Sequence, residues 1–556
     1  MNMAADQASI EAIAGSTAHK EFRIVGPPGC GKSTTIRHWA AKAVDRYGSD
    51  GVMVTSFSRA AAMEIASRGL AVDRQMVGTL HSMALRAIGK PTIAETRIDE
   101  WNATHPAYRL TPSASRDINT PARASNDGKT PGDKLMEQAQ RLRKLMTPHA
   151  SWPSHVMLFE KRWREWKDEH EFVDFTGLLE VALETIPVAP GAPSVLFVDE
   201  AQDLGVLELA LVRSWMSQTE FGVLVFDTDQ TIYSFTGASP EALLAQDVPP
   251  ENVRVLSQSY RIPRVVHEFA VKWIEQSSFR YPSVYNPREE EGELHRIGAT
   301  FQNPNALVAD VAKAKGTTMI LASCSYMLAP TIKRLRSQGI PFQNKGQATN
   351  GSWNPMRGVP KVLAFLAPDP RLATPDRPNR LWTYAEARAW VALIRSAGVL
   401  KRGAKAEIGR QRDARKGTDA ALTPITPDEL RELFEPEALG ELTAAFTDGT
   451  ATTWLARSSL AQHTKRLRFY DAVARNRGVN ALLEEPSVTV GTLHSSKGCE
   501  ADEVHIFPDL SQSGFAEWRG TPQQRDTIRR LFYVGATRAR RRLVLAKPAT
   551  PMTIRW

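Results

Sequence analysis

A glycine-rich stretch near the start of the chain has the residue types and spacing that bind phosphate. Residues 26–33 read GPPGCGKS and lie between the apolar run 22–25 and a helical run. Glycines let backbone N–H groups converge on an anion, and the N-terminus of the following helix adds its positive dipole end. Lys32 supplies a mobile charge and Ser33 a hydroxyl for Mg²⁺, although a plain glycine turn is the alternative. The candidate phosphate-binding residues are Gly26, Pro27, Pro28, Gly29, Cys30, Gly31, Lys32, Ser33 and Thr34.

A pair of adjacent acids ends a second apolar run. Residues 195–200 read VLFVDE, the pattern of a buried strand that ends in two carboxylates. In phosphoryl transfer the first of two such carboxylates holds Mg²⁺, and the second orients or deprotonates the attacking water. Asp199 is therefore a candidate metal ligand and Glu200 a candidate catalytic residue. Alone, the pair is equally compatible with an ordinary strand end, and the phosphate loop is what strengthens the functional interpretation.

The elements that must position these residues are short buried strands alternating with helices. Apolar runs of this kind suit strands covered on both faces, so the pattern predicts an α/β fold with parallel sheets. The runs form two groups, and we identify no internal repeats. The predicted strands are 22–26, 52–57, 195–200, 222–227, 253–256, 317–323, 488–493 and 504–508.

The two groups of strands predict two α/β cores, each interrupted by a mainly helical insertion. Strand signals are sparse in the two interrupting stretches. The predicted division is a first core from 1–90 and 190–270 with an insertion at 91–189, and a second core from 271–370 and 485–556 with an insertion at 371–484.

Composition sets broader limits on the class of protein. The 556 residues carry a formal net charge of +9, with 42% hydrophobic and 24% charged residues. This balance is typical of globular chains and disfavours collagen-like, disordered and disulfide-stapled classes. Three separated cysteines, Cys30, Cys324 and Cys499, suggest neither a disulfide framework nor a zinc site. With no apolar stretch of signal-peptide or membrane-spanning type, we expect a soluble cytoplasmic protein without a membrane partner.

Further blocks of sequence follow one another in a fixed order. They are VTSFSRAAAMEI (54–65), GTLHS (78–82), DEAQD (199–203), FDTDQTIYSFTGA (226–238), LSQSYRIP (256–263), LRSQGIPF (335–342), VGTLHSSKGCEADEV (490–504) and RRLFYVGATRAR (529–540). Together with the phosphate loop, these blocks resemble the motifs of UvrD/Rep-like superfamily 1 DNA helicases, nearly from end to end. The resemblance implies two RecA-like P-loop NTPase cores that bind ATP and Mg²⁺ between them.

The resemblance also implies roles for individual residues around the nucleotide. Gln230 would contact the attacking water and the γ-phosphate, and Arg261 and Arg538 would neutralise charge on that phosphate. Together with Lys32 and Glu200 they make up the catalytic set. The residues expected to contact adenine or ribose are Gln7, Tyr260 and Glu500.

On the opposite face the family threads single-stranded DNA past aromatic rings and small polar groups. The candidate DNA contacts are Ser58, Arg59, Thr79, His81, Tyr233, Phe235, Thr492 and His494. A structural role is the alternative for each of them, because buried aromatics and lone histidines are common in protein cores.

Five positions depart from the usual motifs. Phe235 and Thr236 stand where the family commonly has Trp and Arg, so a ring is kept and a charge is lost. Phe226 replaces a Gly and Ser259 an Asn, and the phenylalanine expected in residues 54–65 is displaced by one position, to Phe57. The lost charge places the coupling of ATP hydrolysis to DNA in question.

The implied function is an ATP-dependent DNA helicase or translocase that moves 3′-to-5′ on single-stranded DNA and unwinds duplexes. Its expected partners are single-stranded DNA and junctions between single and double strands. A DNA-binding ATPase that regulates or loads other proteins, with little unwinding, is one alternative. A P-loop kinase or small-molecule NTPase is a second alternative if the later blocks are coincidental.

Overall fold

The first of two parallel sheets is built from two separated stretches of the chain. The computed structural model describes residues 20–57, 71–112, 130–344, 351–376 and 379–556. The sheet has the strand order β3-β2-β4-β5-β1-β6, with every neighbouring pair parallel. Its strands are β1 (Glu21–Val25), β2 (Val52–Ser56), β3 (Val77–Thr79), β4 (Val195–Asp199), β5 (Phe221–Phe226) and β6 (Val253–Val255).

The second sheet has the same parallel character and the order β7-β12-β11-β8-β10-β9. Its strands are β7 (Glu293–Ile297), β8 (Thr318–Ala322), β9 (Phe342–Gln343), β10 (Val488–Thr492), β11 (Ala501–Ile506) and β12 (Ala539–Ala546). We call each sheet with its packed helices the first core and the second core. Two cores of parallel strands flanked by helices confirm the predicted fold class.

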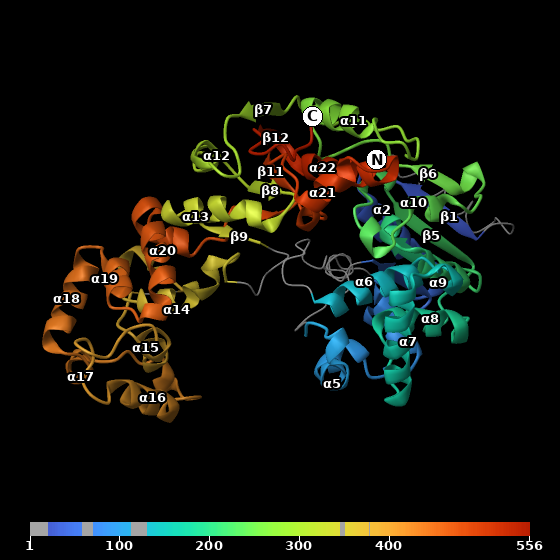
Figure 1. Cartoon of the computed structure of the whole chain (residues 1–556). Coiled ribbons are helices and arrows are strands. Elements are labelled where there is room, and N and C mark those ends of the chain that lie inside the picture. Colours follow the sequence, from blue (N-terminus) through green and yellow to red (C-terminus); the bar gives the residue numbers. More distant parts are fainter. Residues whose placement is uncertain (1–19, 58–70, 113–129, 345–350, 377–378) are drawn as a thin grey trace.

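Helices connect and cover the strands of both cores (Figure 1). In the first core they are α2 (Lys32–Tyr47), α4 (Leu80–Ala87), α8 (Phe175–Thr185), α9 (Val206–Met216) and α10 (Pro240–Leu244). In the second core they are α11 (Arg264–Ile274), α12 (Asn305–Val311), α13 (Ala329–Ser337), α21 (Gln512–Trp518) and α22 (Pro522–Ala536).

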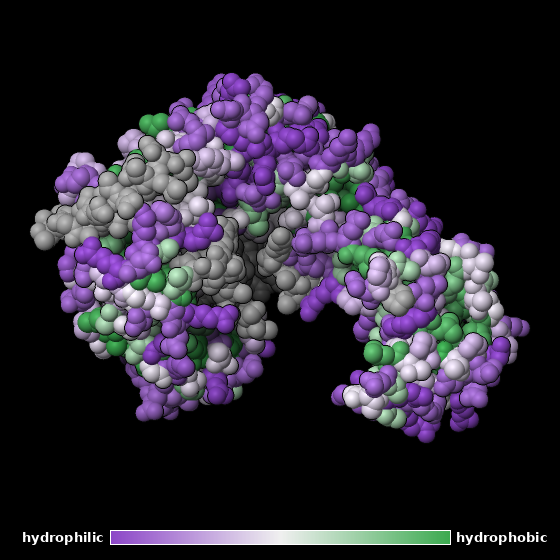
Figure 2. Space-filling model, turned by 180° about the vertical axis from the view of Figure 1, so that it is seen from behind, coloured by the Kyte–Doolittle hydropathy of each residue, from purple (hydrophilic) through white to green (hydrophobic). Residues whose placement is uncertain are grey.

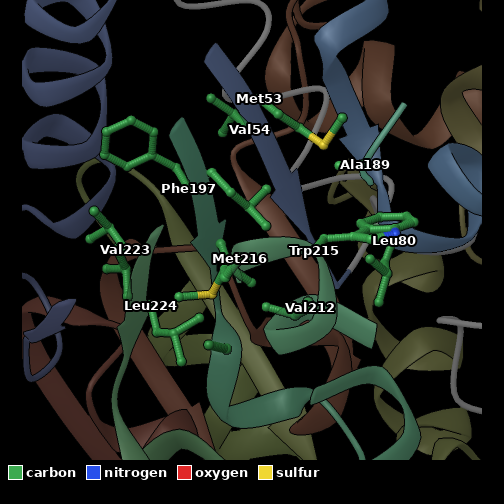
Figure 3. Packing of buried hydrophobic residues seen from close by; sticks show 14 of the residues in the cluster. Met53, Val54, Leu80, Ala189, Phe197, Val212, Trp215, Met216, Val223 and Leu224 are labelled. Carbon is green, nitrogen blue, oxygen red and sulfur yellow. The ribbon is translucent and has the colours of Figure 1, made fainter. Parts of the chain in front are cut away.

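The hydrophobic centre of the first core forms because its central strands are apolar on both faces. Every residue of β1, β2, β4 and β5 is buried. Figure 3 shows Met53 and Leu224 on the side of the sheet where Trp215 and Met216 of α9 lie, and Phe197 and Val223 on the opposite side. Leu178, Leu179 and Ala182 of α8 join this cluster, so α8 packs on the first core although the sequence analysis assigns 91–189 to the insertion.

The first insertion has a small core of its own that is rich in tryptophan. It contains α5 (Ile98–Thr104), α6 (Pro131–Lys144) and α7 (Ser154–Glu169). Trp101, Trp163 and Trp166 pack against one another at 5.0 to 5.5 Å between ring centroids. The aromatic residues of α7 are therefore structural. Lys161, Arg162 and Arg164 face solvent, whereas Lys167 is buried in an ion pair with Asp174.

The second insertion forms a separate helical lobe (Figure 1). Figure 2 shows a wide notch between this lobe and the first core on a face where hydrophilic side chains predominate. The lobe's core begins at Val359, so α14 packs with the lobe although the sequence analysis begins the insertion at residue 371. The helices are α14 (Val359–Phe365), α15 (Tyr384–Val391), α16 (Ala404–Ala414), α17 (Pro427–Leu433), α18 (Pro436–Thr447), α19 (Ala451–Arg457) and α20 (Ala461–Arg477).

Candidate nucleotide and nucleic-acid sites

The phosphate loop joins β1 to α2. Gly29 and Gly31 have φ values of +78° and +79°, which favour glycine, and the loop then enters the first turn of α2. The Lys32 Nζ donates a hydrogen bond to the Gly26 carbonyl at 2.6 Å, so the ammonium group folds back over the loop. Burial raises the pKa of the Cys30 thiol to about 12, so this cysteine remains protonated.

Asp199 is the last residue of β4, and Glu200 follows it at the carboxyl edge of the same sheet. Burial and the neighbouring charge of Glu200 raise the pKa of Asp199 to about 7. Lys32 opposes that shift, which places its charge close to Asp199. A buried carboxylate with excess negative charge nearby and the Ser33 hydroxyl are hard oxygen donors, so this set fits Mg²⁺.

Lys497 of the second core reaches across to this acidic pair. It ends the 3₁₀ turn η15 (His494–Ser496), and its Nζ lies 3.3 Å from Glu200 Oε2 and forms an ion pair with Asp203. The same Nζ donates to the Gln230 carbonyl at 3.1 Å. Burial opposes ionisation of Glu200, but Lys497 and Lys32 lower the pKa of its carboxyl to about 2.

Gln230 lies where the first core meets the end of α22 in the second core. It is the last residue of the 3₁₀ turn η6 (Thr228–Gln230) and is buried. Its Nε2 donates to Asp227 Oδ2 at 2.6 Å, while its Oε1 accepts from Arg538 Nη2 at 2.8 Å. Burial and nearby Arg261 lower the pKa of Arg538 to about 10, which leaves the guanidinium charged at neutral pH. The structure thus brings these predicted catalytic residues together.

The segment after β6 braces the phosphate loop. The Tyr260 N–H donates to the Gly29 carbonyl at 2.9 Å, and the Ser259 Oγ donates to the Pro28 carbonyl at 3.1 Å. The Tyr260 ring is 60% exposed, as a stacking surface requires. Ser259 also accepts from the backbone N–H of Ile262 at 3.1 Å, so the departure to serine keeps a bridging side chain.

Glu500 joins the two arginines that flank it. Its carboxylate accepts from Arg261 Nε at 2.7 Å and from Arg540 Nη1 at 3.1 Å. Arg261 and Glu500 are therefore adjacent, as the predicted nucleotide site requires. Gln7 lies outside the described residues.

The hexapeptide VGTLHS occurs in both cores, at 77–82 and 490–495, so the expectation of no internal repeat is wrong at this short scale. The first three residues of each copy are the last three residues of a parallel strand, β3 or β10. In the first copy Ser82 N donates to Thr79 Oγ1 at 3.2 Å, and in the second Ser495 N donates to Thr492 Oγ1 at 3.3 Å. The two candidate threonines thus form the same turn.

The histidines of the two copies have different surroundings. Burial, with the charge of Lys144, lowers the pKa of His81 to about 3, and its Nε2 has no hydrogen-bond partner among the described residues. His494 is half-buried, and burial lowers its pKa to about 4. Its ring centroid lies 6.4 Å from that of Tyr233.

Tyr233 sits between the two cores beside the catalytic cluster. Its ring stacks on Phe57 at 5.5 Å, and Lys497 Nζ lies 5.5 Å from the ring centroid. The displaced phenylalanine therefore packs against a candidate DNA contact. The Phe235 side chain, Ser58 and Arg59 lie outside the description, although the Phe235 backbone belongs to the 3₁₀ turn η7 (Ser234–Thr236).

Sequence reasoning assigned no role to Lys497, Asp227 or Gln202. Gln202 accepts from the Asp227 N–H at 3.0 Å and donates to Glu200, so it connects the two acidic turns. The signal for Lys497 was present, because it stands in the VGTLHSSKG block, but the contact with Glu200 requires both cores to be placed.

A second cluster of possible metal ligands lies away from this cleft. Asp310, Glu503 and His505 bring their ligand atoms within 4.8 Å of one another. Arg542 Nη1 already lies 3.2 Å from Asp310 and 3.3 Å from Glu503. The cluster is therefore an ion-pair network whose negative charge is neutralised by arginine.

A phosphate loop, an acidic strand end and Arg538 from a second parallel core define a two-core fold of the P-loop NTPase type. Family models match it in two places: an AAA domain at residues 9–236 and a UvrD-like helicase C-terminal domain at residues 450–549. With the fold, these matches make the chain a UvrD/Rep-like member of superfamily 1. In the described residues, no helix is both long and apolar enough to span a bilayer.

Curated relatives share modest identity with the chain. ATP-dependent DNA helicase UvrD2 of Mycobacterium tuberculosis is 25% identical over 374 residues, covering 63% of this chain and 46% of the relative. ATP-dependent DNA helicase PcrA of Staphylococcus aureus is 24% identical over 328 residues, covering 52% and 43%. The chain thus spans about half the length of the relatives it matches or less.

Proposed function

We propose that the chain is an ATP-dependent DNA translocase and helicase that moves 3′-to-5′ on single-stranded DNA and unwinds duplex DNA at junctions. The observation that carries the proposal is the meeting of Gln230 from the first core with Arg538 from the second at 2.8 Å. A nucleotide site completed by both cores allows hydrolysis to change how the cores are held together.

In this proposal the first core binds the phosphates and the metal. The phosphate loop and Lys32 hold the β- and γ-phosphates, while Ser33 and Asp199 hold Mg²⁺, which neutralises phosphate charge when bound. Glu200 accepts the proton of the attacking water, which Gln230 orients. Because Lys497 lowers the pKa of Glu200, a movement that withdraws Lys497 makes Glu200 a stronger base.

Arg538 of the second core and Arg261 of the segment after β6 supply positive charge, and neighbouring residues hold the nucleoside. Arg261 and Arg538 stabilise negative charge on the γ-phosphate. The exposed Tyr260 ring stacks on adenine and Glu500 contacts the ribose. The contacts of Arg538 and Glu500 form only when the second core approaches the first, which ties ATP binding to cleft closure.

Single-stranded DNA would cross both cores beside Tyr233. Thr79 and Thr492 are each the last residue of a parallel strand, and Phe235 and His494 lie in segments near Tyr233 in sequence or space. A strand that spans both turns is gripped by each core in turn as the cleft opens and closes. The predicted domain division, adjusted to include α14 in the helical lobe and α8 in the first core, belongs to this proposal.

A regulator or loader with little unwinding is a second candidate, favoured by the loss of a charge at Thr236. Strand displacement on duplexes with a 3′ or a 5′ tail separates the two. We expect unwinding of the 3′-tailed duplex only, none by Lys32→Ala, and normal activity in Lys42→Ala on the same helix. DNA-stimulated ATP hydrolysis without displacement would favour the regulator, and preference for the 5′ tail would reverse the proposed polarity.

A further inference from the structure

Residues 278–281 lie between α11 and β7 in the sequence. They form a short crossing segment that contacts both cores. The Ser278 backbone N–H and Oγ donate to Asp526 Oδ2 at 2.8 and 2.6 Å. Arg530 Nη2 donates to the Phe279 carbonyl at 2.8 Å. Both partners belong to α22, the helix that leads into Arg538. One side of the segment is therefore fixed to the second core.

The other side of the crossing segment holds the turn η6 of the first core. Arg280 Nε and Nη2 donate to Asp229 Oδ2 at 3.0 and 2.6 Å, and the Tyr281 N–H donates to Thr228 Oγ1 at 3.1 Å. The Tyr281 ring meets Phe226 edge-on at 6.1 Å. Phe226, a departure from the usual motif, thus packs against the crossing segment.

Arg280 is the ion-pair partner of a carboxylate that is otherwise buried. The Asp229 side chain is 9% exposed and that of Arg280 27% exposed. Burial raises the pKa of Asp229 to about 6, and the hydrogen bond from Arg280 opposes the rise. A paired buried carboxylate has a defined position, whereas an unpaired one must move or take up a proton.

The position of Asp229 determines that of Gln230. The two residues are adjacent in η6, whose first turn is closed by Asp227 through a hydrogen bond from Asp229 N–H at 3.0 Å. Gln230 in turn contacts Arg538 at 2.8 Å. Displacement of a reacting group by about 1 Å can cost on the order of 100-fold in rate.

We infer that Arg280 is a positioning residue for ATP hydrolysis: by holding Asp229 from a segment fixed to α22, it keeps Gln230 aligned with Arg538. The inference rests on the proposed ATPase function of the same site. In this inference the crossing segment links α22 to η6, the turn that orients the attacking water, so that a shift of α22 also shifts η6.

The kinetic test compares Arg280→Gln, Asp229→Asn and the double variant with the parent chain. Each single variant should lower the kcat for ATP at saturating single-stranded DNA by about 10-fold or more, with KM for ATP changed less than about 3-fold. The double variant should be no slower than the slower single variant, because both changes break one contact. Arg280→Lys, which keeps the charge, should recover part of the rate.

The control and a second readout separate positioning from folding. Arg264 lies on nearby α11 and forms an exposed ion pair with Glu291. Arg264→Gln removes this ion pair and should leave kcat unchanged. Binding of a non-hydrolysable ATP analogue at one site per chain counts the folded molecules. An unchanged kcat in Arg280→Gln, or additive losses in the double variant, would overturn the inference.

Hydrogen–deuterium exchange tests the same contact without relying on activity. Arg280→Gln should raise exchange in both 226–231 and 526–538, while a change confined to 278–281 would contradict the inference. Failure of the parent chain to hydrolyse ATP would instead refute the proposed function, and the exchange result would still decide whether Arg280 links the two elements.

Discussion

The two VGTLHS segments compare one sequence in two surroundings. Both end a parallel strand, and in both the serine Oγ donates to the threonine carbonyl, at 2.7 Å in the first core and 2.8 Å in the second. The first copy continues into α4 and buries His81. The second continues into η15 and extends Lys497 to Glu200 across the cleft. The hexapeptide thus determines the turn, and the residues after it determine what the turn does.

The largest expected effect comes from removing the charge of Lys497, which follows the second copy and has no counterpart after the first. Lys497 lies near both Glu200 and the Tyr233 ring, so Lys497→Met should disconnect the DNA side from the nucleotide side. We expect the ratio of ATP turnover with DNA to turnover without DNA to fall on the order of 100-fold.

The matched control is Lys547→Met, an exposed lysine at the end of β12 in the same core. Its ratio should equal that of the parent. If Lys497→Met keeps the parent's ratio, the residue that follows the second copy does not couple ATP turnover to DNA.

Phe235 lies in η7, close in sequence to Tyr233 and thus to the second copy. If its ring stacks on a base, Phe235→Ala should weaken single-stranded DNA binding by about 1–3 kcal/mol. Fluorescence anisotropy at fixed salt measures this. Unchanged affinity together with a lower melting temperature would make Phe235 a core residue instead.

Substitution of the two histidines should affect different properties: DNA binding for His494 and stability for His81. His494 lies beside Tyr233, so His494→Ala should weaken DNA binding by about 1 kcal/mol, the scale of one hydrogen bond. His81 is buried, so His81→Ala should mainly lower the free energy of unfolding, by about 1–2 kcal/mol. Titrations and denaturant unfolding of both variants give the comparison, and the opposite ordering would refute it.

The smallest effect should be shared by both copies. Thr79→Ala and Thr492→Ala each remove an acceptor for a serine N–H, at a cost of about 0.5–1 kcal/mol in unfolding free energy. Thr79→Ser and Thr492→Ser keep the acceptor and serve as controls. A large difference between the two alanine variants would show that the turns are not equivalent.

Much of the fold could be predicted because its strands are short buried apolar runs. The strands β1, β2, β4, β5, β8 and β10 all lie within or overlap predicted strands, since both faces of each are covered. No predicted strand covers the edge strand β7 or any part of β12, because the exposed residues of β7 and of the arginine-rich start of β12 are polar. The placement of α8 and α14 also escaped prediction, because an amphipathic helix does not reveal which neighbour covers its apolar face.

The residues of the candidate nucleotide site could be chosen from local motifs, but the contacts between them could not. Lys32, Asp199 and Glu200 stand in blocks whose spacing indicates phosphate chemistry. Arg280 stands in no such block, and its partner Asp229 lies 51 residues away in sequence. Such contacts depend on how two separately folded cores meet.

The most direct test is steady-state ATP hydrolysis with and without single-stranded DNA at stated salt, with Lys32→Ala as the blank. The account predicts turnover that requires Lys32, is strongly stimulated by DNA in the parent chain and is weakly stimulated in Lys497→Met. Turnover that requires Lys32 but ignores DNA would contradict the claim that the nucleotide site is coupled to a DNA-binding face.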